Sequence, residues 1–557
     1  MAQHPRFRYQ TVAGADALFT PSFVDYLLAL HDELAPRITT LLGRRADALA
    51  RALTQGALPA HPPRSEANTG DWKVPPVPDD LRQPGIEISG PCSITSMFIN
   101  ALNPGPEGER AEGDLDDDED SGGHRLVDTV QAAHNRVAAV QRELYFRDAA
   151  RNREYKIAPG ELPFFMHRER GIHLSEPEVT IDGRPANAAL LGTALTLFYA
   201  GRAQAERSQG IYFYLPKLEF AAEARLYRDL FDGSRARLPW LARATIRAIV
   251  LVESLPCVYE MEEMLFELGP YAAGLNAARW DLKASVFEYV MADPGSVWPD
   301  RFGVDVKTTP FIADIFRRLV AVCLKRGAVP IGGMATALPS ADPEVNRAAA
   351  EAIRKDKEWE AAQGFIRAWV AHIFHMKTAA DPFRQLIASG WKPSARMADP
   401  DSFPVRIEVP AGPVTVEGTR RNARMLIEYV EGWLNGRGAK GIDSLEGKPG
   451  IHPALMEDLA TGRMSVAQIA QRIRHGARTS EGPAARHDFA LVKRLLAEEL
   501  DDILSRRPAD AALHERYRKA VPIAMRWIKN YTDLDFRSLG SYTRRELDAI
   551  AAGPEAF

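Results

Sequence analysis

The stretch Ile246-Arg-Ala-Ile-Val-Leu-Val-Glu-Ser-Leu-Pro-Cys257 opens with an apolar run that ends in the carboxylate Glu253. Downstream, Gly274-Leu-Asn-Ala-Ala-Arg-Trp-Asp281 is a second short apolar segment that ends in a carboxylate, Asp281. Short apolar runs of this kind are typical of buried β-strands. Because the loops at the carboxyl ends of the strands carry the active site in a barrel of parallel strands, we expect the two acids to meet there.

Two carboxylates brought together beside water suit a Mg²⁺ ion, which takes hard oxygen ligands and keeps several waters. Mn²⁺ accepts the same oxygen ligands and is the other candidate. The alternative interpretation is structural: Glu253 caps a helix, and Asp281 pairs with an arginine. The two apolar segments by themselves leave both interpretations open.

Seven short β-branched or aromatic runs alternate with helical patterns after residue 84, which predicts βα units and a parallel sheet. We expect an α/β protein built on a (β/α)₈ TIM barrel. Its eighth strand is expected between Gly105 and Val127, ending in the acidic run at 112–120, although such a run is usually a solvated loop. An open doubly wound sheet is the alternative, but no glycine-rich dinucleotide fingerprint supports it. The seven runs lie at 85–89, 164–167, 210–215, 246–252, 272–275, 328–331 and 365–370.

The flanking segments predict two further units. Residues 20–55 have apolar side chains at helical spacing and 59–84 are rich in proline, so 1–84 is expected to be a helical clasp with an extended linker. The barrel is expected over 85–380, with a hairpin insertion that turns at Asp182-Gly183. Residues 381–557 are expected to form a C-terminal domain that begins with a β ribbon at 404–409 and 413–417 and continues as a helical plug.

The composition excludes several classes of protein. The 557 residues are 46% hydrophobic and 26% charged with a net charge of −4, the balance of a globular enzyme that does not bind nucleic acid. The three cysteines fit neither a disulfide framework nor a zinc spacing. No apolar run reaches the roughly 18 residues of a membrane span, and the N-terminus lacks an apolar signal segment, so we expect no membrane partner and a cytoplasmic location. The sequence does not indicate an oligomeric state.

Several strings, taken together and in this order, resemble malate synthase in the form that lacks a large inserted domain. The resemblance covers nearly the whole chain. The strings are Gly70-Asp-Trp-Lys-Val74, Gly90-Pro91 with Ile99-Asn-Ala-Leu-Asn103, Arg168-Glu-Arg-Gly-Ile-His-Leu174, Tyr212-Phe-Tyr-Leu-Pro-Lys217, Glu253-Ser-Leu-Pro256, Gly274-Leu-Asn-Ala-Ala-Arg-Trp-Asp281, Gly332-Gly-Met-Ala335, Trp369-Val-Ala-His372 and Leu455-Met-Glu-Asp-Leu-Ala-Thr461.

The resemblance implies a Mg²⁺-dependent Claisen condensation of acetyl-CoA with glyoxylate, followed by hydrolysis of malyl-CoA to malate and CoA, as in the glyoxylate bypass. Asp458 matches the family's base, and Arg168 matches the arginine that holds the developing oxyanion. Glu253 and Asp281 match the metal ligands. A carboxylate removes the weakly acidic thioester α-proton only if the enolate is stabilised as it forms. On sequence pattern alone, Asp458 is an acid in the first turn of a helix.

Further site residues follow from the same resemblance. Arg170 would face the same way as Arg168 in a strand, so the two arginines can exchange roles. Lys217 and Glu219 follow a predicted strand and either line the site or pair with each other. The expected substrate-binding string contributes Gly274, Leu275 and Trp280 beside Asp281, and an acidic string of the family matches Asp117, Glu119, Asp120 and Ser121.

The chain also departs from the family pattern at 268–271, 282–285 and 364–367, and it carries an additional segment at about 445–453. The changes near Gly274 and Asp458 are expected to lie close to the thioester and the base. The altered segments after Asp281 and before Asp458 favour a rival interpretation, a related CoA-thioester enzyme that uses another 2-oxo acid or cleaves malyl-CoA-type thioesters without hydrolysing them. A degenerate, non-catalytic paralogue is the second rival. The joint presence of the four matched catalytic and metal-binding residues argues against it.

Overall fold

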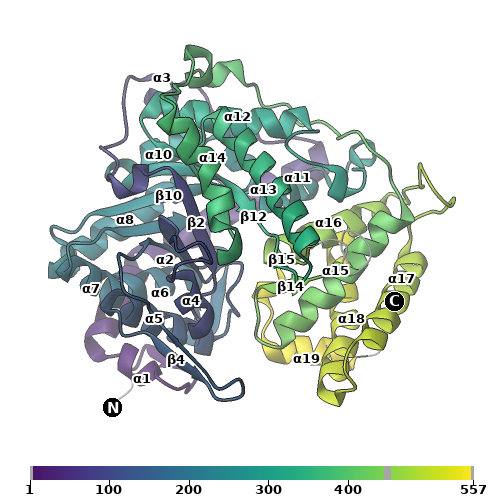
Figure 1. The fold of residues 1–557 in the computed structure, drawn as a ribbon, viewed down its shortest axis with the longest axis horizontal. Coiled ribbons are helices and arrows are strands. Elements are labelled where there is room, and N and C mark those ends of the chain that lie inside the picture. The colour runs from purple at the N-terminus through teal and green to yellow at the C-terminus, as the bar shows by residue number, and fades with distance from the viewer. Residues whose placement is uncertain (1–3, 444–452, 554–557) are drawn as a thin grey trace.

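The computed structural model describes residues 4–443 and 453–553. Within them, eight parallel strands close into a barrel in the order β10-β11-β12-β13-β2-β3-β6-β9, which confirms the predicted (β/α)₈ fold (Figure 1). Each of the seven predicted runs overlaps a barrel strand, and the eighth strand lies in the expected interval. The bounds are β2 Gly85–Gly90, β3 Gly113–Asp117, β6 Phe164–Arg168, β9 Ile211–Leu215, β10 Ile246–Val252, β11 Ala272–Ala277, β12 Val329–Ala335 and β13 Arg367–Val370.

Helices surround the barrel, as alternating strand and helix patterns require. The last of them, α14, spans the predicted domain boundary at 380, and it packs against β2, β13 and α13. The division of the chain at that residue therefore remains a prediction. The surrounding helices are α4 Thr95–Ala101, α5 Leu126–Gln141, α6 Ala188–Leu195, α7 Gly201–Glu206, α8 Ala221–Arg237, α9 Leu255–Tyr259, α10 Met261–Leu268, α11 Arg279–Val290, α12 Pro310–Arg326, α13 Pro343–Gln363 and α14 Met376–Ala388.

The acidic run forms strand β3 because buried cations on its neighbours pair with most of its carboxylates. Asp116 accepts hydrogen bonds from Arg136 at 2.6 Å and from His167 at 2.7 Å, and Arg136 also reaches Asp118 at 3.1 Å. Burial raises the pKa of the Asp114 carboxyl well above its ordinary value. A run whose composition is typical of a solvated loop is thus a buried barrel strand, because cations of neighbouring segments pair with most of its acids.

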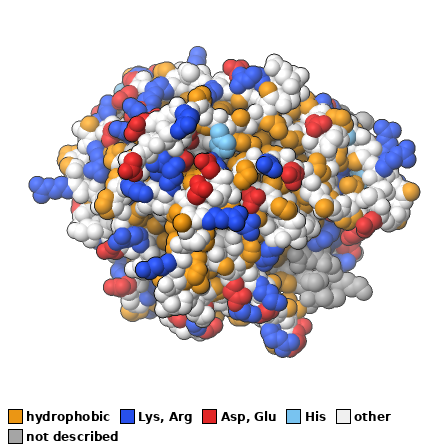
Figure 2. All heavy atoms as spheres, turned by 90° about the horizontal axis from the view of Figure 1, so that it is seen from above, with side chains coloured by type: hydrophobic (Ala, Val, Ile, Leu, Met, Phe, Trp, Pro, Cys, Tyr) orange, Lys and Arg blue, Asp and Glu red, His pale blue; other side chains and the backbone are white. Residues whose placement is uncertain are grey.

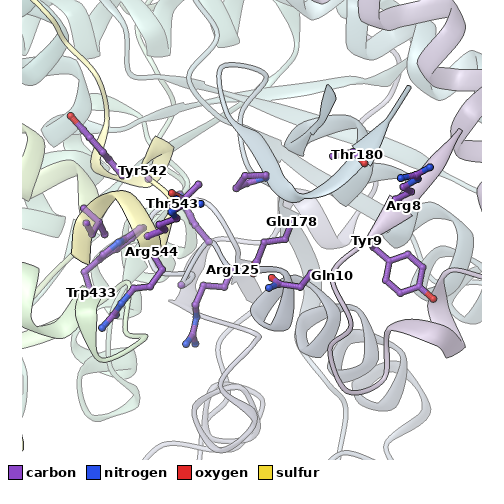
Figure 3. Close-up of a pocket in the computed structure, with 16 residues that line it drawn as sticks. Arg8, Tyr9, Gln10, Arg125, Glu178, Thr180, Trp433, Tyr542, Thr543 and Arg544 are labelled. Atoms are coloured by element: carbon purple, nitrogen blue, oxygen red, sulfur yellow. The ribbon is translucent and has the colours of Figure 1, made fainter. Parts of the chain in front are cut away.

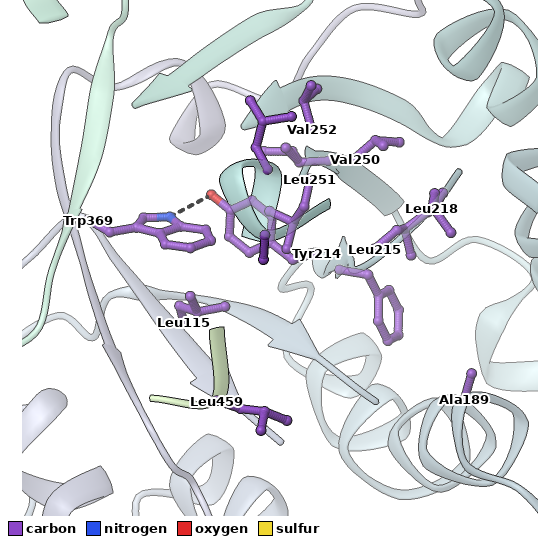
Figure 4. Close-up of a cluster of buried hydrophobic side chains, with 14 of the residues drawn as sticks. Leu115, Ala189, Tyr214, Leu215, Leu218, Val250, Leu251, Val252, Trp369 and Leu459 are labelled. Carbon is purple, nitrogen blue, oxygen red and sulfur yellow. Dashed lines mark hydrogen bonds between the residues drawn. The ribbon is translucent and has the colours of Figure 1, made fainter. Parts of the chain in front are cut away.

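A buried polar group that we call the core cluster (Glu87, Tyr214, Arg367 and Trp369) crosses the barrel interior. Both oxygens of Glu87 accept hydrogen bonds, one from Arg367 Nε at 2.6 Å and the other from the Tyr214 hydroxyl at 2.7 Å and Trp369 Nε1 at 3.1 Å. The indole also donates to the Tyr214 hydroxyl at 3.1 Å, among apolar side chains of neighbouring strands (Figure 4). Arg367 occupies one of the segments where the chain departs from the family pattern, and its partner Glu87 neutralises it.

The N-terminal unit packs on the outside of the barrel. Helix α2 (Pro21–Gln55) confirms the predicted helix, starts at the N-cap Thr20 and contacts α6, α8 and α11. The short α3 (Glu66–Thr69) lies within the otherwise extended proline-rich linker. The predicted hairpin is confirmed as β7 (Ser175–Ile181) and β8 (Arg184–Asn187). The N-terminal strand β1 (Phe7–Tyr9) pairs antiparallel with the free edge of β7, and the short helix α1 (Ala15–Leu18) follows β1 in the chain.

A second hairpin, β4 (Tyr145–Asp148) with β5 (Arg153–Lys156), was not predicted. Its exposed strands mix charged and aromatic residues and show no clean alternation of apolar and polar side chains.

The C-terminal unit is a group of helices beside the barrel (Figure 1). The predicted ribbon at 404–409 and 413–417 is wrong: residues 404–415 form no strand, and α15 begins at Val416. Three prolines in that stretch lack the N–H donors that a ladder needs. The pair that does form is β14 (Lys440–Ile442) with β15 (Leu455–Glu457), and most of the additional segment at 445–453 lies outside the described residues. The helices are α15 Val416–Leu434, α16 Leu459–Arg474, α17 Phe489–Arg506, α18 Ala511–Thr532 and α19 Arg544–Ala552.

The surface carries both signs of charge. On the face in Figure 2, basic and acidic side chains are interspersed, in keeping with the small net charge of −4. Across the part of the chain that the structure describes, no helix is long and apolar enough to cross a lipid bilayer.

Candidate active site

Carboxylates from three segments converge at the carboxyl ends of the barrel strands. Glu253 directly follows β10, as predicted, but Asp281 does not end a strand: β11 stops at Ala277 and Asp281 lies in the first turn of α11. Asp120, from the loop after β3, completes the group. Ligand oxygens of these three side chains lie within 4.8 Å of one another, and all three side chains are buried. We call Glu119, Asp120, Lys217, Glu253 and Asp281 the mouth cluster.

Lys217 stands at the centre of the mouth cluster. Its ammonium group lies 2.5 Å from Asp281 Oδ2 and 3.0 Å from Asp120 Oδ1, and it is 3.7 and 3.8 Å from Glu119 and Glu253. The residue holds a left-handed backbone conformation, with φ of 55°, at the end of β9. Its backbone N–H donates to Glu253 Oε1. Lys217 was predicted either to line the site or to pair with Glu219, and these contacts place it in the site.

The mouth cluster carries more acid than its lysine balances. Both oxygens of Glu119 and Oε2 of Glu253 are buried without a hydrogen-bond partner. Burial, reinforced by neighbouring acids and only partly offset by Lys217, raises the pKa of Glu119 to about 8 and that of Glu253 to about 8. Buried oxygens that lack donors, beside three carboxylates within ligand distance of each other, fit a hard divalent cation. These residues therefore form a possible metal-binding group.

The structure separates the two arginines that the sequence left interchangeable. Arg168, the last residue of β6, donates from Nε and Nη2 to the two oxygens of Asp117, both at 2.7 Å, and its Nη1 lies 3.2 Å from Asp120. Burial alone would raise the pKa of Asp117, but Arg168 lowers it to about 2. Arg170 points elsewhere and pairs with Glu176 at 2.6 Å. The expectation that both face one way is wrong, because the strand ends at Arg168.

Asp458 reaches the barrel mouth from the C-terminal unit. It is the N-cap of α16, and its Oδ1 accepts a hydrogen bond from the Thr461 N–H at 3.2 Å. It lines the same small cavity as Asp120, Arg168, Glu253 and Asp281. Burial, followed by the nearby charges of Asp120 and Asp281, raises the pKa of its carboxyl well above the ordinary value. Asp458 is therefore a helix-terminus acid, as the structural interpretation had it, and it also lines the mouth cavity.

The remaining predicted residues divide into two groups. Trp280 lines the cavity, whereas Gly274 and Leu275 are buried within β11. A side chain at Gly274 would collide with the Val329 carbonyl oxygen, so this glycine serves close strand packing. Glu219 lies away from Lys217: it accepts a hydrogen bond from the Tyr289 hydroxyl at 3.1 Å and lies 3.8 Å from Arg45.

Arg463 was not predicted, although it touches the site. It lies on α16, and its guanidinium reaches Asp281 Oδ1 at 3.0 Å and Glu288 at 2.5 Å. The arginine pairing that the alternative interpretation gave to Asp281 is therefore present alongside the carboxylate group. The local sequence around Arg463 does not predict this role, because its partners Glu288 and Asp281 lie more than 170 residues away in the chain.

The fold and the site together define a class: (β/α)₈-barrel proteins whose mouth gathers carboxylates suited to a divalent cation. The "Malate synthase, TIM barrel domain" family matches residues 164–403, and the "Malate synthase, C-terminal" family matches residues 413–544. The chain belongs to the malate synthase family.

Relatives along nearly the whole chain agree with this assignment. A malate synthase of Streptomyces clavuligerus is 36% identical over 542 residues, covering 96% of each chain. One from Myxococcus xanthus is 35% identical over 87% of this chain and 86% of its own length. The glyoxysomal malate synthase of Ricinus communis is 32% identical over 94% of this chain and 91% of its own. The predicted family resemblance is confirmed.

Proposed function

We propose that this protein is a malate synthase: it condenses acetyl-CoA with glyoxylate and hydrolyses the malyl-CoA thioester to give malate and CoA, with Mg²⁺ bound at the mouth. The observation that carries the proposal is the meeting of Asp458 with Arg168, Glu253 and Asp281 around one cavity. These four residues come from both halves of the chain. Their convergence supplies a base, a cation and metal ligands within one enclosed space.

Asp458 is the proposed base for the acetyl methyl proton. Its capping bond to Thr461 fixes the side chain while the residue lines the cavity. Burial makes this carboxylate a stronger base than a solvated aspartate, because a raised pKa increases the driving force for taking a proton. The first turn of α16 adds a partial positive charge that keeps the ionised form available.

Arg168 is the proposed electrostatic partner of the enolate and of glyoxylate. Asp117 accepts hydrogen bonds from two nitrogens of the Arg168 guanidinium, and the central carbon of that group lies 5.4 Å from the centre of the Trp369 ring. These contacts fix the Arg168 side chain before substrate binds. Its third nitrogen, Nη1, faces Asp120 and the cavity. A donor held in place in a dry site stabilises developing negative charge without reorganisation.

Asp120, Glu253 and Asp281 would hold the Mg²⁺ ion. When bound, this ion supplies Lewis-acid polarisation of the glyoxylate aldehyde and a template for its carboxylate. Glu119, whose oxygens are buried and unpartnered, is placed to accept hydrogen bonds from water in the same group. Lys217 balances part of the acid charge and holds Asp120 and Asp281 in position.

The cavity at the mouth holds about 30 Å³, enough for water but not for a thioester and an aldehyde together. We infer that the C-terminal unit moves away from the barrel to admit the substrates and then closes again. Closure would exclude water while the enolate forms, a common form of gating.

Two of the departures from the family pattern lie away from the mouth. Residues 268–271 precede β11, and residues 364–367 lead into β13, which begins at Arg367, so both segments lie at the opposite end of the barrel from the mouth. The expectation that the first of these segments lies near the thioester is wrong. In the third segment, 282–285, Lys283 lies beside a residue of the mouth cavity: its ammonium is 4.6 Å from the ring of Trp280 and donates to the Val304 carbonyl.

The test is release of the CoA thiol, followed with a thiol-reactive dye in the presence of acetyl-CoA, glyoxylate and Mg²⁺. The Asp458→Asn variant is compared with Asp488→Asn, a matched control, because Asp488 is also an N-cap and asparagine preserves both caps. We expect the wild type and the control to release thiol, and Asp458→Asn to lose about 10²–10⁴-fold in rate. Absence of thiol release from folded wild type would refute the proposal. Other 2-oxo acids, run in parallel, test the rival acceptors.

A further inference from the structure

A large cavity lies apart from the barrel mouth, where the N-terminal strand, the barrel and the last helix meet. It encloses about 610 Å³, within the range of small-molecule sites, and shares no lining residue with the mouth cavity. Figure 3 shows Trp433, Tyr542 and Arg544 of the C-terminal unit on one side, Arg8 of β1 on the other, and Arg125 between them. We call this space the junction cavity.

The lining of the junction cavity is strongly basic. Four arginines contribute to it against a single acid, Glu178, whose Oε2 already accepts a hydrogen bond from the Leu126 N–H at 2.7 Å. Arg125 is paired with Asp128, and Arg544 donates to the Leu434 carbonyl and lies 3.4 Å from Asp548. The side chains of the other two, Arg8 and Arg545, are exposed and have no hydrogen-bond or ion-pair partner among residues 4–443 and 453–553.

The first turn of α19 also lines the cavity. Thr543, Arg544 and Arg545 contribute to the lining, and a capping box joins Thr543 to Glu546, whose carboxylate accepts the Thr543 N–H at 2.7 Å and its hydroxyl at 2.9 Å. The N–H groups of Arg544 and Arg545, which follow the N-cap, have no acceptor within the helix and can donate to a bound anion. The cavity lining thus combines two arginines without a side-chain partner and the start of a helix.

The cavity also has an apolar side. Trp433, Tyr542 and Leu547 line it beside the arginines. A bare inorganic ion would leave this surface uncovered, whereas an organic molecule would bury it.

We propose that the junction cavity binds a small organic polyanion, one with two or more phosphate or carboxylate groups, as a site separate from the proposed reaction. Arg8 and Arg545 hold the charged groups. The walls of the cavity belong to the N-terminal strand, the barrel and the C-terminal unit, so the ligand ties these parts together.

The junction cavity adjoins the loop that carries the acids of the mouth. His124, which lines the cavity, contacts the Glu119 carbonyl oxygen through Nε2. The Leu459 N–H, next to Asp458, lies 3.4 Å from the Asp120 carbonyl oxygen. A ligand that fixes α19 against this loop favours the closed arrangement of Asp458 over the barrel, so its binding is linked to substrate binding.

The test is calorimetric titration of the full chain with citrate as the carboxylate probe and pyrophosphate as the phosphate probe. It is run without Mg²⁺ at about 0.15 M salt to screen weak surface binding. The double variant Arg8→Gln/Arg545→Gln is compared with Arg64→Gln/Arg243→Gln, which removes the same charge from exposed arginines outside the cavity. Arg168→Gln serves to identify binding at the mouth.

We expect citrate, pyrophosphate or both to bind the wild type, the charge-matched control and Arg168→Gln alike. In the Arg8→Gln/Arg545→Gln variant the dissociation constant rises at least about tenfold. No binding of either probe up to about 10 mM, equal binding to the double variant, or loss of binding in Arg168→Gln overturns the proposal. The titration contains no substrate, so its outcome is independent of whether the protein condenses acetyl-CoA with glyoxylate.

Discussion

Two groups of buried charge share the barrel, and they are built on opposite principles. In the core cluster a single acid, Glu87, has both oxygens satisfied, by Arg367 on one side and by Tyr214 and Trp369 on the other. In the mouth cluster four carboxylates surround one lysine, and oxygens of Glu119 and Glu253 have no donor. Arg367 Nη2 is buried without a partner, so the core cluster is satisfied at its acid and not at every atom. A buried acid whose two oxygens are both hydrogen-bonded helps to rigidify a fold. A cluster with more carboxylates than cations destabilises the fold when no metal ion is bound, so it is suited to binding a divalent cation.

The same difference separates Arg367 from Arg168. Both lie on barrel strands and are paired with a buried acid. Arg367 is enclosed at the start of β13, whereas Arg168 ends β6 and turns one nitrogen toward the cavity. Position along the strand, not residue type, determines which arginine is available for chemistry.

The largest expected effect is on activity at the mouth. Glu253→Gln removes a proposed metal ligand, and we expect the rate of thiol release to fall at least about 10²-fold at saturating Mg²⁺, because the charge stabilisation by the ion is lost. Steady-state kinetics over a range of Mg²⁺ concentrations measures it. An unchanged dependence on Mg²⁺ would show that Glu253 is not a ligand.

The next effect is on stability at the core cluster. Glu87→Gln leaves the buried Arg367 charge without its counter-ion, which costs about 3–5 kcal/mol. We expect a clear fall in melting temperature, by calorimetry, with thiol release per folded molecule much less affected than in Glu253→Gln. A variant that melts like the wild type would mean that the pair contributes nothing to the fold.

Removing an acid from the mouth cluster should raise the stability of the fold, whereas Glu87→Gln in the core cluster should lower it. Glu119→Gln takes away a buried carboxylate with two unpartnered oxygens, so without Mg²⁺ we expect a gain of about 1 kcal/mol and a higher melting temperature. The measurement is melting in EDTA beside Glu87→Gln. If both variants lose stability equally, the contrast between the clusters is wrong.

The smallest effect concerns the ion alone. At about 100 times its dissociation constant, a ligand that binds only the folded state adds about 2.7 kcal/mol. We expect Mg²⁺ to raise the melting temperature of the wild type and to leave that of Glu253→Gln unchanged. A shift of equal size in both proteins would place the bound ion elsewhere.

Sequence patterns predicted most of the barrel because seven of its strands coincide with short β-branched or aromatic runs, and burial of such runs fixes their place regardless of the loops. The eighth, β3, is acidic, so pattern alone gave only the interval in which it lies. The patterns failed at 404–417, where alternation suggested two strands but 404–415 form no strand and 416–417 begin α15. The hairpin at 145–156 was missed because its strands are exposed and charged. Local pattern therefore predicts an element reliably only when the pattern reflects burial.

Sequence by itself determined the eight strands, the acid that follows β10 and, through the ordered strings, the family. Only the tertiary structure decided which arginine faces the cavity, that Lys217 stands among four acids, and that Arg463 joins Asp281 from α16. The physical reason is distance along the chain: the burial of a strand follows from residues next to one another, whereas the charges at the mouth come from segments as far apart as Asp120 and Asp458, which 458 − 120 = 338 positions separate. Their pairing depends on how the barrel closes and where the C-terminal unit packs.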